Sequence, residues 1–132
     1  MSGPTKDRID ITVTAEKTDP DRLIDTKSVG TNSMYTTEAM RDTVLRVRSV
    51  QSNRFIGTNI KYNSEIPPSL INRYCKLGKK ESEFIKDAMN SMEFSARAYH
   101  KILKVARTIA DIDECGTISI DHLSEAICYR GA

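Results

Sequence analysis

Apolar residues recur at helical spacing from Ser95 to about Ile112, and this is the strongest pattern in the chain. They occupy positions i, i+4, i+7, i+11 and i+14, which lie along one side of a helix: Ala98, Ile102, Val105, Ile109 and Ile112. Ser95 stands where an N-cap is needed, because its hydroxyl can accept a free backbone N–H of the first turn. We therefore expect a helix here that buries its apolar stripe.

A second helical pattern lies in the first half of the chain. Thr36 or Thr37 can cap a helix that runs to about Asn53. Its inward stripe is predicted to contain Met40, Val44, Val47 and Gln51, widened by Leu45 and Val50. Arginines occupy the other face of this helix.

Prolines and glycines mark the limits of the other helices. Pro67 and Pro68 suit the first turn of a short helix over about 69–76, because the N–H that proline lacks has no helical partner there. Gly78 is expected to close that helix. The remaining helices are expected over about 80–93 and, after the cap Ser119, up to about residue 131. The predicted fold is mainly α, with four or five helices.

The N-terminal part predicts a single strand. Residues 9–15 alternate between apolar and polar side chains and are rich in β-branched residues. A lone strand leaves its backbone donors and acceptors without partners. The segment therefore either lies as a single ribbon on the helices or belongs to a sheet outside this chain. Residues 16–35 mix charges, Pro20, Gly30 and small polar side chains, which predicts a loop or linker.

The composition is that of an ordinary globular domain, with 39% hydrophobic and 29% charged residues among 132. The 20 basic residues nearly balance the 18 acidic ones, so the net charge of +2 argues neither for nor against nucleic acid. No apolar run reaches the ~20 residues that span a bilayer, and the N-terminus lacks the apolar segment of a secretory signal. We expect a cytoplasmic protein with no membrane partner.

Residues that carry catalytic or metal chemistry are sparse. The chain has three cysteines, Cys75, Cys115 and Cys128. Their odd number and the lack of CxxC spacing argue against a disulfide scaffold, and neither histidine has ligand spacing with them, so no metal site is expected. Phosphate-binding glycine loops, a nucleophile elbow and HExxH are absent. The acid pairs Asp19/Asp21 and Asp111/Asp113 are interpreted as solvated residues of linkers or turns.

Two arginines are candidates for contacts to anions. Arg97 falls in the first turn of the Ser95 helix, where free N–H groups and the helix dipole attract anions, and its planar fork fits phosphate oxygens. Lys101 and Lys104 share its face, and spacing alone favours a solvated basic face opposite the apolar stripe. Arg8 precedes the predicted strand. Composition favours a plain surface residue there, and the functional alternative is an arginine offered to a neighbouring subunit's nucleotide.

Several long stretches resemble the magnesium-chelatase-like AAA+ ATPases, and most of all the ComM/YifB branch, which is linked to competence and DNA transactions. They are SGPTKDRIDITV, RFIGTNIKYNSEI, FSARAYHKILKVARTIADI and SIDHLSEAICYR. The resemblance covers nearly the whole chain and is weakest over residues 16–36. SARAYxxILxVARTIAD is a long and specific pattern.

The resemblance implies an α/β nucleotide-binding core followed by a helical lid. It assigns residues 1–18 to the last strand segment of the core, 19–35 to a linker loop and 36–132 to the lid. The phosphate-binding loop and the acidic Mg²⁺ motif would precede residue 1. ATP and Mg²⁺ are therefore expected as cofactors of a longer protein, with neither bound tightly by this part and no catalysis by it alone.

The resemblance also implies a role for each arginine. Arg97 matches the sensor-2 arginine, which reaches the phosphates of ATP bound to the same subunit. Arg8 matches the arginine finger, which reaches the γ-phosphate held by a neighbouring subunit and can be worth roughly 10³–10⁵ in rate. The implied partners are the protein's own AAA+ core and the adjacent subunits of a ring, expected to be a hexamer.

Two alternatives remain open at this point. One is the lid of a true magnesium-chelatase ATPase subunit, which serves porphyrin metallation. The other is a non-enzymatic helical DNA-binding module with a basic footprint. That footprint would consist of Arg41, Arg46, Arg48, Lys101 and Lys104.

Overall fold

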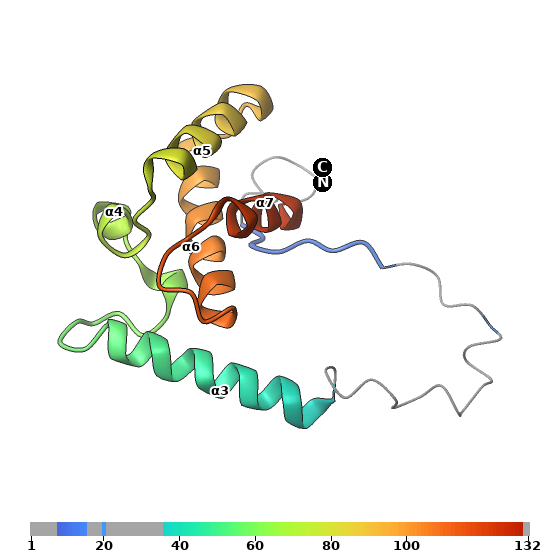
Figure 1. Cartoon of the computed structure of the whole chain (residues 1–132), viewed down its shortest axis with the longest axis vertical. Helices are drawn as coiled ribbons and strands as arrows, with labels where there is room; N and C mark the ends of the chain where they lie inside the picture. Colours follow the sequence, from blue (N-terminus) through green and yellow to red (C-terminus); the bar gives the residue numbers. More distant parts are fainter. Residues whose placement is uncertain (1–7, 16–19, 21–35, 131–132) are drawn as a thin grey trace.

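The computed structural model describes residues 8–15, 20 and 36–130. Within these ranges the chain forms five α-helices and two 3-10 turns (Figure 1). They are α3 (Thr37–Arg54), η2 (Asn63–Glu65), η3 (Pro68–Leu70), α4 (Ile71–Tyr74), α5 (Lys79–Met92), α6 (Ala96–Ile112) and α7 (Ile120–Tyr129). The expected mainly helical fold is confirmed. In this described part of the chain, no helix combines the length and the apolar character needed to cross a membrane.

The central element is α6, the helix with the strongest sequence pattern. It contacts α3, α4, α7 and η2, and Figure 1 shows it running between them. Its predicted cap is confirmed, because the Ser95 hydroxyl accepts the Ala98 N–H at 3.1 Å. The predicted stripe is buried from Ala98 to Ile109, whereas Val105 is half-buried and Ile112 is 43% exposed.

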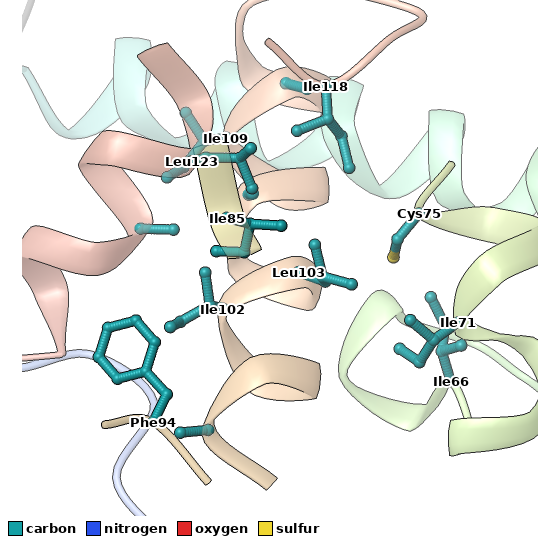
Figure 2. Packing of buried hydrophobic residues seen from close by; sticks show 14 of the residues in the cluster. Ile66, Ile71, Cys75, Ile85, Phe94, Ile102, Leu103, Ile109, Ile118 and Leu123 are labelled. Carbon is teal, nitrogen blue, oxygen red and sulfur yellow. The ribbon is translucent and has the colours of Figure 1, made fainter. Parts of the chain in front are cut away.

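The hydrophobic core lies around α6 and joins α4, α5 and α7, whereas α3 contributes none of its own residues to it. The largest fully buried aliphatic side chains come from the residue after η2, from α4, from α6 and from α7: Ile66, Ile71, Leu103 and Leu123. Figure 2 shows Leu103 between the α4 side of the core, with Ile66 and Ile71, and the α7 side, with Leu123. Burying one such side chain contributes about 1.5–3 kcal/mol. The core therefore fixes α4, α5 and α7 on α6.

The N-terminal segment differs from the prediction. Residues 8–15 contain no strand, so the expected N-terminal strand is not observed within the described residues, and its pairing with a sheet outside this chain stays a prediction. Their backbone has no neighbouring strand among the described residues, and the segment lies instead as a single ribbon on the helices. Thr12 donates its N–H to the Tyr129 carbonyl at 2.6 Å, and Lys101 Nζ donates to the Ile9 carbonyl at 3.3 Å. Most of the predicted linker, residues 19 and 21–35, lies outside the described residues.

Helix α3 begins at the predicted cap but buries less than predicted. The Thr36 hydroxyl accepts the Ala39 N–H at 3.1 Å, yet only Val47 and Gln51 of the predicted stripe are buried. The other four apolar positions are 38–54% exposed: Met40, Val44, Leu45 and Val50. Figure 1 shows the reason, because the N-terminal half of α3 extends beyond the other helices.

Two helix boundaries differ from the expectation that a glycine ends a helix. Gly78 has φ −72° and precedes α5 as its N-cap, so its predicted role as the end of the preceding helix is wrong. Helix α6 ends with Glu114 in the left-handed conformation, at φ 59°. The Cys115 N–H then reaches the Ala110 carbonyl at 2.8 Å, and the Glu114 N–H reaches the Asp111 carbonyl at 3.2 Å. This is a Schellman motif, and it forms the turn after α6.

A buried polar cluster joins the ends of α3 and α6. The Asp111 side chain is only 1% exposed, so its interpretation as a solvated turn residue is wrong. Both of its oxygens accept hydrogen bonds from the Arg54 guanidinium. Asn63 Nδ2 donates to the same carboxylate at 2.9 Å. Arg107 Nε lies 3.3 Å from Asp111 Oδ1, as an ion pair without hydrogen-bond geometry. We call these four residues the Asp111 cluster.

Two further arginine contacts strengthen this junction. Arg107 donates to the carbonyls of Gly116 at 3.0 Å and Cys115 at 2.7 Å, which holds the turn after α6. From α3, Arg46 donates to the Ile112 carbonyl at 2.9 Å and to the Asp111 carbonyl at 3.3 Å. The Asp111 carbonyl also accepts the Glu114 N–H, whereas the Ile112 carbonyl has no helical partner at the end of α6, and a cation there also complements the helix dipole.

Replacing Asp111 should destabilise the fold strongly. Asp111→Ala leaves the buried guanidinium of Arg107 and the half-buried one of Arg54 without their carboxylate, and breaking a buried ion pair from one side costs about 3–5 kcal/mol. We expect that loss in the free energy of unfolding measured by urea denaturation. The matched control is Asp87→Ala, because Asp87 is an exposed carboxylate on α5. A loss below about 1 kcal/mol for Asp111→Ala would contradict a central role for the cluster.

Candidate functional site

A hollow of about 700 Å³ lies along the outer side of α6. Its walls are the ribbon residues 10–13, α6 from Arg97 to Ile112, and the C-terminal half of α7. The ribbon side is apolar and open to solvent, since Ile11 and Val13 are 54% and 69% exposed. The hollow therefore combines an apolar wall with cationic side chains from α6.

Arg97 lines this hollow at the N-terminal end of α6. It is the second helical residue after the cap Ser95, and its side chain is exposed. The Ser95 hydroxyl satisfies only the Ala98 N–H. The N–H groups of Ala96 and Arg97 have no acceptor among the described residues. An anion placed here would meet two free N–H groups, the positive end of the helix dipole and a guanidinium.

The two lysines on the same face as Arg97, Lys101 and Lys104, form contacts within the chain. Lys101 is only 17% exposed, and its Nζ lies 3.7 Å from Asp10 Oδ1 as well as near the Ile9 carbonyl. Lys104 Nζ donates to the Ser64 carbonyl at 3.3 Å. Both lysines line the hollow together with apolar residues of α6. The interpretation as a solvated basic face opposite the stripe therefore holds for the exposed Arg97 but not for the two half-buried lysines, since Lys101 contacts the ribbon and Lys104 contacts η2.

Arg8 lies at a turn immediately before the ribbon and is exposed. It is not among the residues that line the hollow, so the structure does not bring Arg8 and Arg97 into one site. Lys101, one helical turn after Arg97, binds Asp10 of the ribbon that follows Arg8. The roles of both arginines in nucleotide binding stay predictions.

The basic residues considered as a DNA footprint differ in their environments. Arg46 is bound to the end of α6 and to Glu114 at 3.4 Å. The Arg48 guanidinium lies over the Tyr62 ring, 5.9 Å from its centroid, and Arg41 is exposed on α3. DNA binding by this set stays a prediction.

His122 has a structural role that the sequence pattern did not reveal. The Ser119 N–H donates to His122 Nδ1 at 3.0 Å, while the Ser119 hydroxyl accepts the His122 N–H at 3.4 Å. This is a capping box at the start of α7, with histidine in place of the usual Glu or Gln. Because Nδ1 accepts a hydrogen bond, Nε2 carries the ring proton and donates to Asp113 Oδ2 at 3.0 Å.

Comparison with known proteins places the chain in a family. The family described as magnesium chelatase, subunit ChlI C-terminal, matches residues 34–130, so this chain belongs to that family. The competence protein ComM of Haemophilus influenzae is 38% identical over 130 residues, which cover 98% of this chain and 24% of ComM. The uncharacterized protein YifB of Escherichia coli is 32% identical over the same length and coverage. The resemblance to the ComM/YifB branch is confirmed, and the chain spans about a quarter of the length of these relatives.

The three cysteines are all free thiols, but their environments differ. Cys75 follows α4 and belongs to the hydrophobic core, with 2% of its surface exposed. Burial raises the pKa of the Cys75 thiol to about 11, although the nearby Arg107 acts in the opposite direction. Cys115 and Cys128 are exposed. Because the thiolate is the reactive form, Cys75 is protected by both its burial and its pKa.

Alkylation should therefore discriminate among the thiols of the folded chain. With iodoacetamide at pH 8, we expect Cys115 and Cys128 to react while Cys75 reacts at least about 100-fold more slowly, because roughly one Cys75 thiol in a thousand is ionised. Peptide mass spectrometry measures each site. In urea all three should react at similar rates, and equally fast labelling of Cys75 in the folded chain would contradict the buried environment.

Proposed function

We propose that this chain is the C-terminal helical lid of an ATP-binding AAA+ ATPase related to magnesium chelatase, of the competence or DNA-processing type. The observation that carries the proposal is the position of Arg97. In a chain of this family, an exposed arginine stands beside free N–H groups at the start of the best-anchored helix. The matches to ComM and YifB over 98% of the chain favour this branch over porphyrin metallation.

In this proposal Arg97 acts as the sensor-2 arginine and binds the phosphates of ATP held by the same subunit. Charge-assisted hydrogen bonds from a guanidinium to phosphate are about twice as strong as neutral ones. The first turn of α6 adds two backbone N–H groups and the helix dipole on the same side. Mg²⁺ and the phosphate-binding loop would come from the AAA+ core, and the chain alone would not hydrolyse ATP.

ATP binding would move the whole lid because the far end of α6 is fixed. The Asp111 cluster joins that end to α3 and η2, and Arg107 holds the turn that leads to α7. A contact between Arg97 and phosphate differs between the ATP-bound and empty states, so it can shift the lid between two positions. The rigid attachment carries that shift to the other helices.

Arg8 would act on the neighbouring subunit as the arginine finger. It is exposed and is followed directly by the ribbon that binds α6 through Lys101 and α7 through Tyr129. The arginine finger would thus be linked through the ribbon to α6, the helix that carries the sensor-2 arginine. The ring, expected to be a hexamer, would couple hydrolysis at one interface to the lid of the adjacent subunit.

The first test concerns Arg97 in the full-length protein that carries this chain. Arg97→Ala should lower the ATPase rate about 10- to 100-fold, because a hydrogen bond to a charged group contributes about 1.5–3 kcal/mol. Phosphate release measures the rate. Circular dichroism should show unchanged helicity, since Arg97 is exposed and makes no intramolecular ion pair among the described residues. The matched control is Arg41→Ala, another exposed helical arginine, and equal rates for the two variants would contradict the proposal.

The second test asks whether Arg8 acts in trans. Rings made only of Arg8→Ala subunits should hydrolyse ATP slowly, because the finger's transition-state contact is missing. Mixing them with subunits that lack a working phosphate-binding loop but keep Arg8 should restore activity, measured as phosphate release. The control mixes Arg8→Ala subunits with partners that lack both features. Rescue no greater than in this control would argue against action between subunits.

A further inference from the structure

A second hollow, of about 670 Å³, lies on a different flank of α6 from Arg97. It is bounded by α4, the connection into α5, and residues 116–118 before α7. Four cationic side chains line it: Arg54, Arg73, Lys76 and Arg107. Glu81 is the only carboxylate in its lining among the described residues. Such a charge excess in a concave surface favours an anionic ligand.

The inner wall of this hollow has a fixed positive charge. Arg54 and Arg107, with side chains 17% and 5% exposed, share a single carboxylate, that of Asp111. The Asp111 carboxylate can accept few further hydrogen bonds, because Arg54, Asn63 and Arg107 already contact both of its oxygens. One buried and one half-buried guanidinium against one carboxylate leave a net charge of about +1, which an anion at the surface of the hollow would compensate.

Arg107 also keeps unused hydrogen-bond donors. A guanidinium has five N–H groups. In Arg107 two of them donate to the carbonyls of Gly116 and Cys115, and Nε–H makes no hydrogen bond. No described acceptor takes the second N–H of either Nη atom. Burial lowers the pKa of Arg107, which reflects a guanidinium with too little solvation or counter-charge.

The rim of the hollow offers accessible groups for a ligand. Arg73 and Lys76 are exposed and form no ion pair among the described residues. The N-terminus of α5 also reaches the rim, and its cap Gly78 supplies no side-chain hydrogen bond. Glu81 covers that helix end, because a Cβ added at Gly78 would meet Glu81 Oε2 at 2.5 Å. An internal carboxylate therefore already occupies part of this anion-favouring position.

We propose that this hollow binds a phosphate group, either free or carried on a nucleic-acid strand. Arg73 and Lys76 are its direct ligands, and the half-buried Arg54 with the buried Arg107 supplies the positive wall behind it. Glu81 competes with the phosphate for the N-terminus of α5. The site is separate from the ATP contact assigned to Arg97 and does not depend on it.

The test measures binding of two probes to the chain at low salt. Pyrophosphate represents the free source and is followed by calorimetry. A fluorescent single-stranded oligothymidylate represents the nucleic-acid source and is followed by anisotropy with a salt titration. At least one probe should bind. The probe that binds shows whether the hollow takes free phosphate or the phosphates of a nucleic-acid strand. Absence of binding by both would overturn the proposal.

Charge variants on the rim locate the binding. The double variant Arg73→Gln with Lys76→Gln should weaken binding of the active probe at least about tenfold, because it removes two direct contacts to phosphate. Glu81→Gln should tighten it severalfold by removing the competing carboxylate. Lys86→Gln, an exposed lysine of α5 outside the hollow, is the matched control. An unaltered affinity in the double variant, or a loss as large in Lys86→Gln, would overturn the assignment.

Discussion

The carboxylate of Asp111 connects parts of the chain that are far apart in sequence. It binds Arg54 at the end of α3, Asn63 in η2 and Arg107 one turn earlier on its own helix. Arg54 and Asp111 are 57 residues apart. A buried charge is tolerated only when its partners are correctly placed, so the pair selects one arrangement of α3 against α6. The apolar core then secures α4, α5 and α7 on the opposite flanks of α6.

Helix α3 illustrates how much depends on that cluster. Most of its apolar side chains are exposed, and its buried residues Val47 and Gln51 lie in the C-terminal half. Gln51 belongs to the same polar network, because its Oε1 accepts the Asn63 N–H at 2.9 Å. The position of α3 is therefore set largely by polar contacts, which are directional, rather than by apolar packing.

Local patterns predicted the features that depend on neighbouring residues. The caps Thr36, Ser95 and Ser119 and the buried stripe of α6 follow from spacing within one or two turns. The burial of Asp111 could not be predicted in this way, because its partners lie in other elements. The N-terminal ribbon failed as a strand for a related reason: alternation shows which residues can form a strand, whereas pairing requires a second strand.

The same distinction applies to the candidate sites. Arg97 could be predicted because a helix start and a specific sequence pattern coincide there. The second hollow had no local signal, since its cations come from α3, α4, the connection after α4 and α6. The excess of arginine over carboxylate around Asp111 becomes visible only after folding.

The attachment of α6 at one end has a mechanical consequence. Its 17 residues make a rod about 25 Å long. Its C-terminal end is clamped by Arg46, Arg54 and Arg107, so α6 behaves as a lever with the clamp as its pivot. A displacement of about 4 Å at the Arg97 end corresponds to a rotation of about 10° over this length. Since α3 is attached near the pivot and α7 packs along α6, both turn with the lever instead of bending away from it.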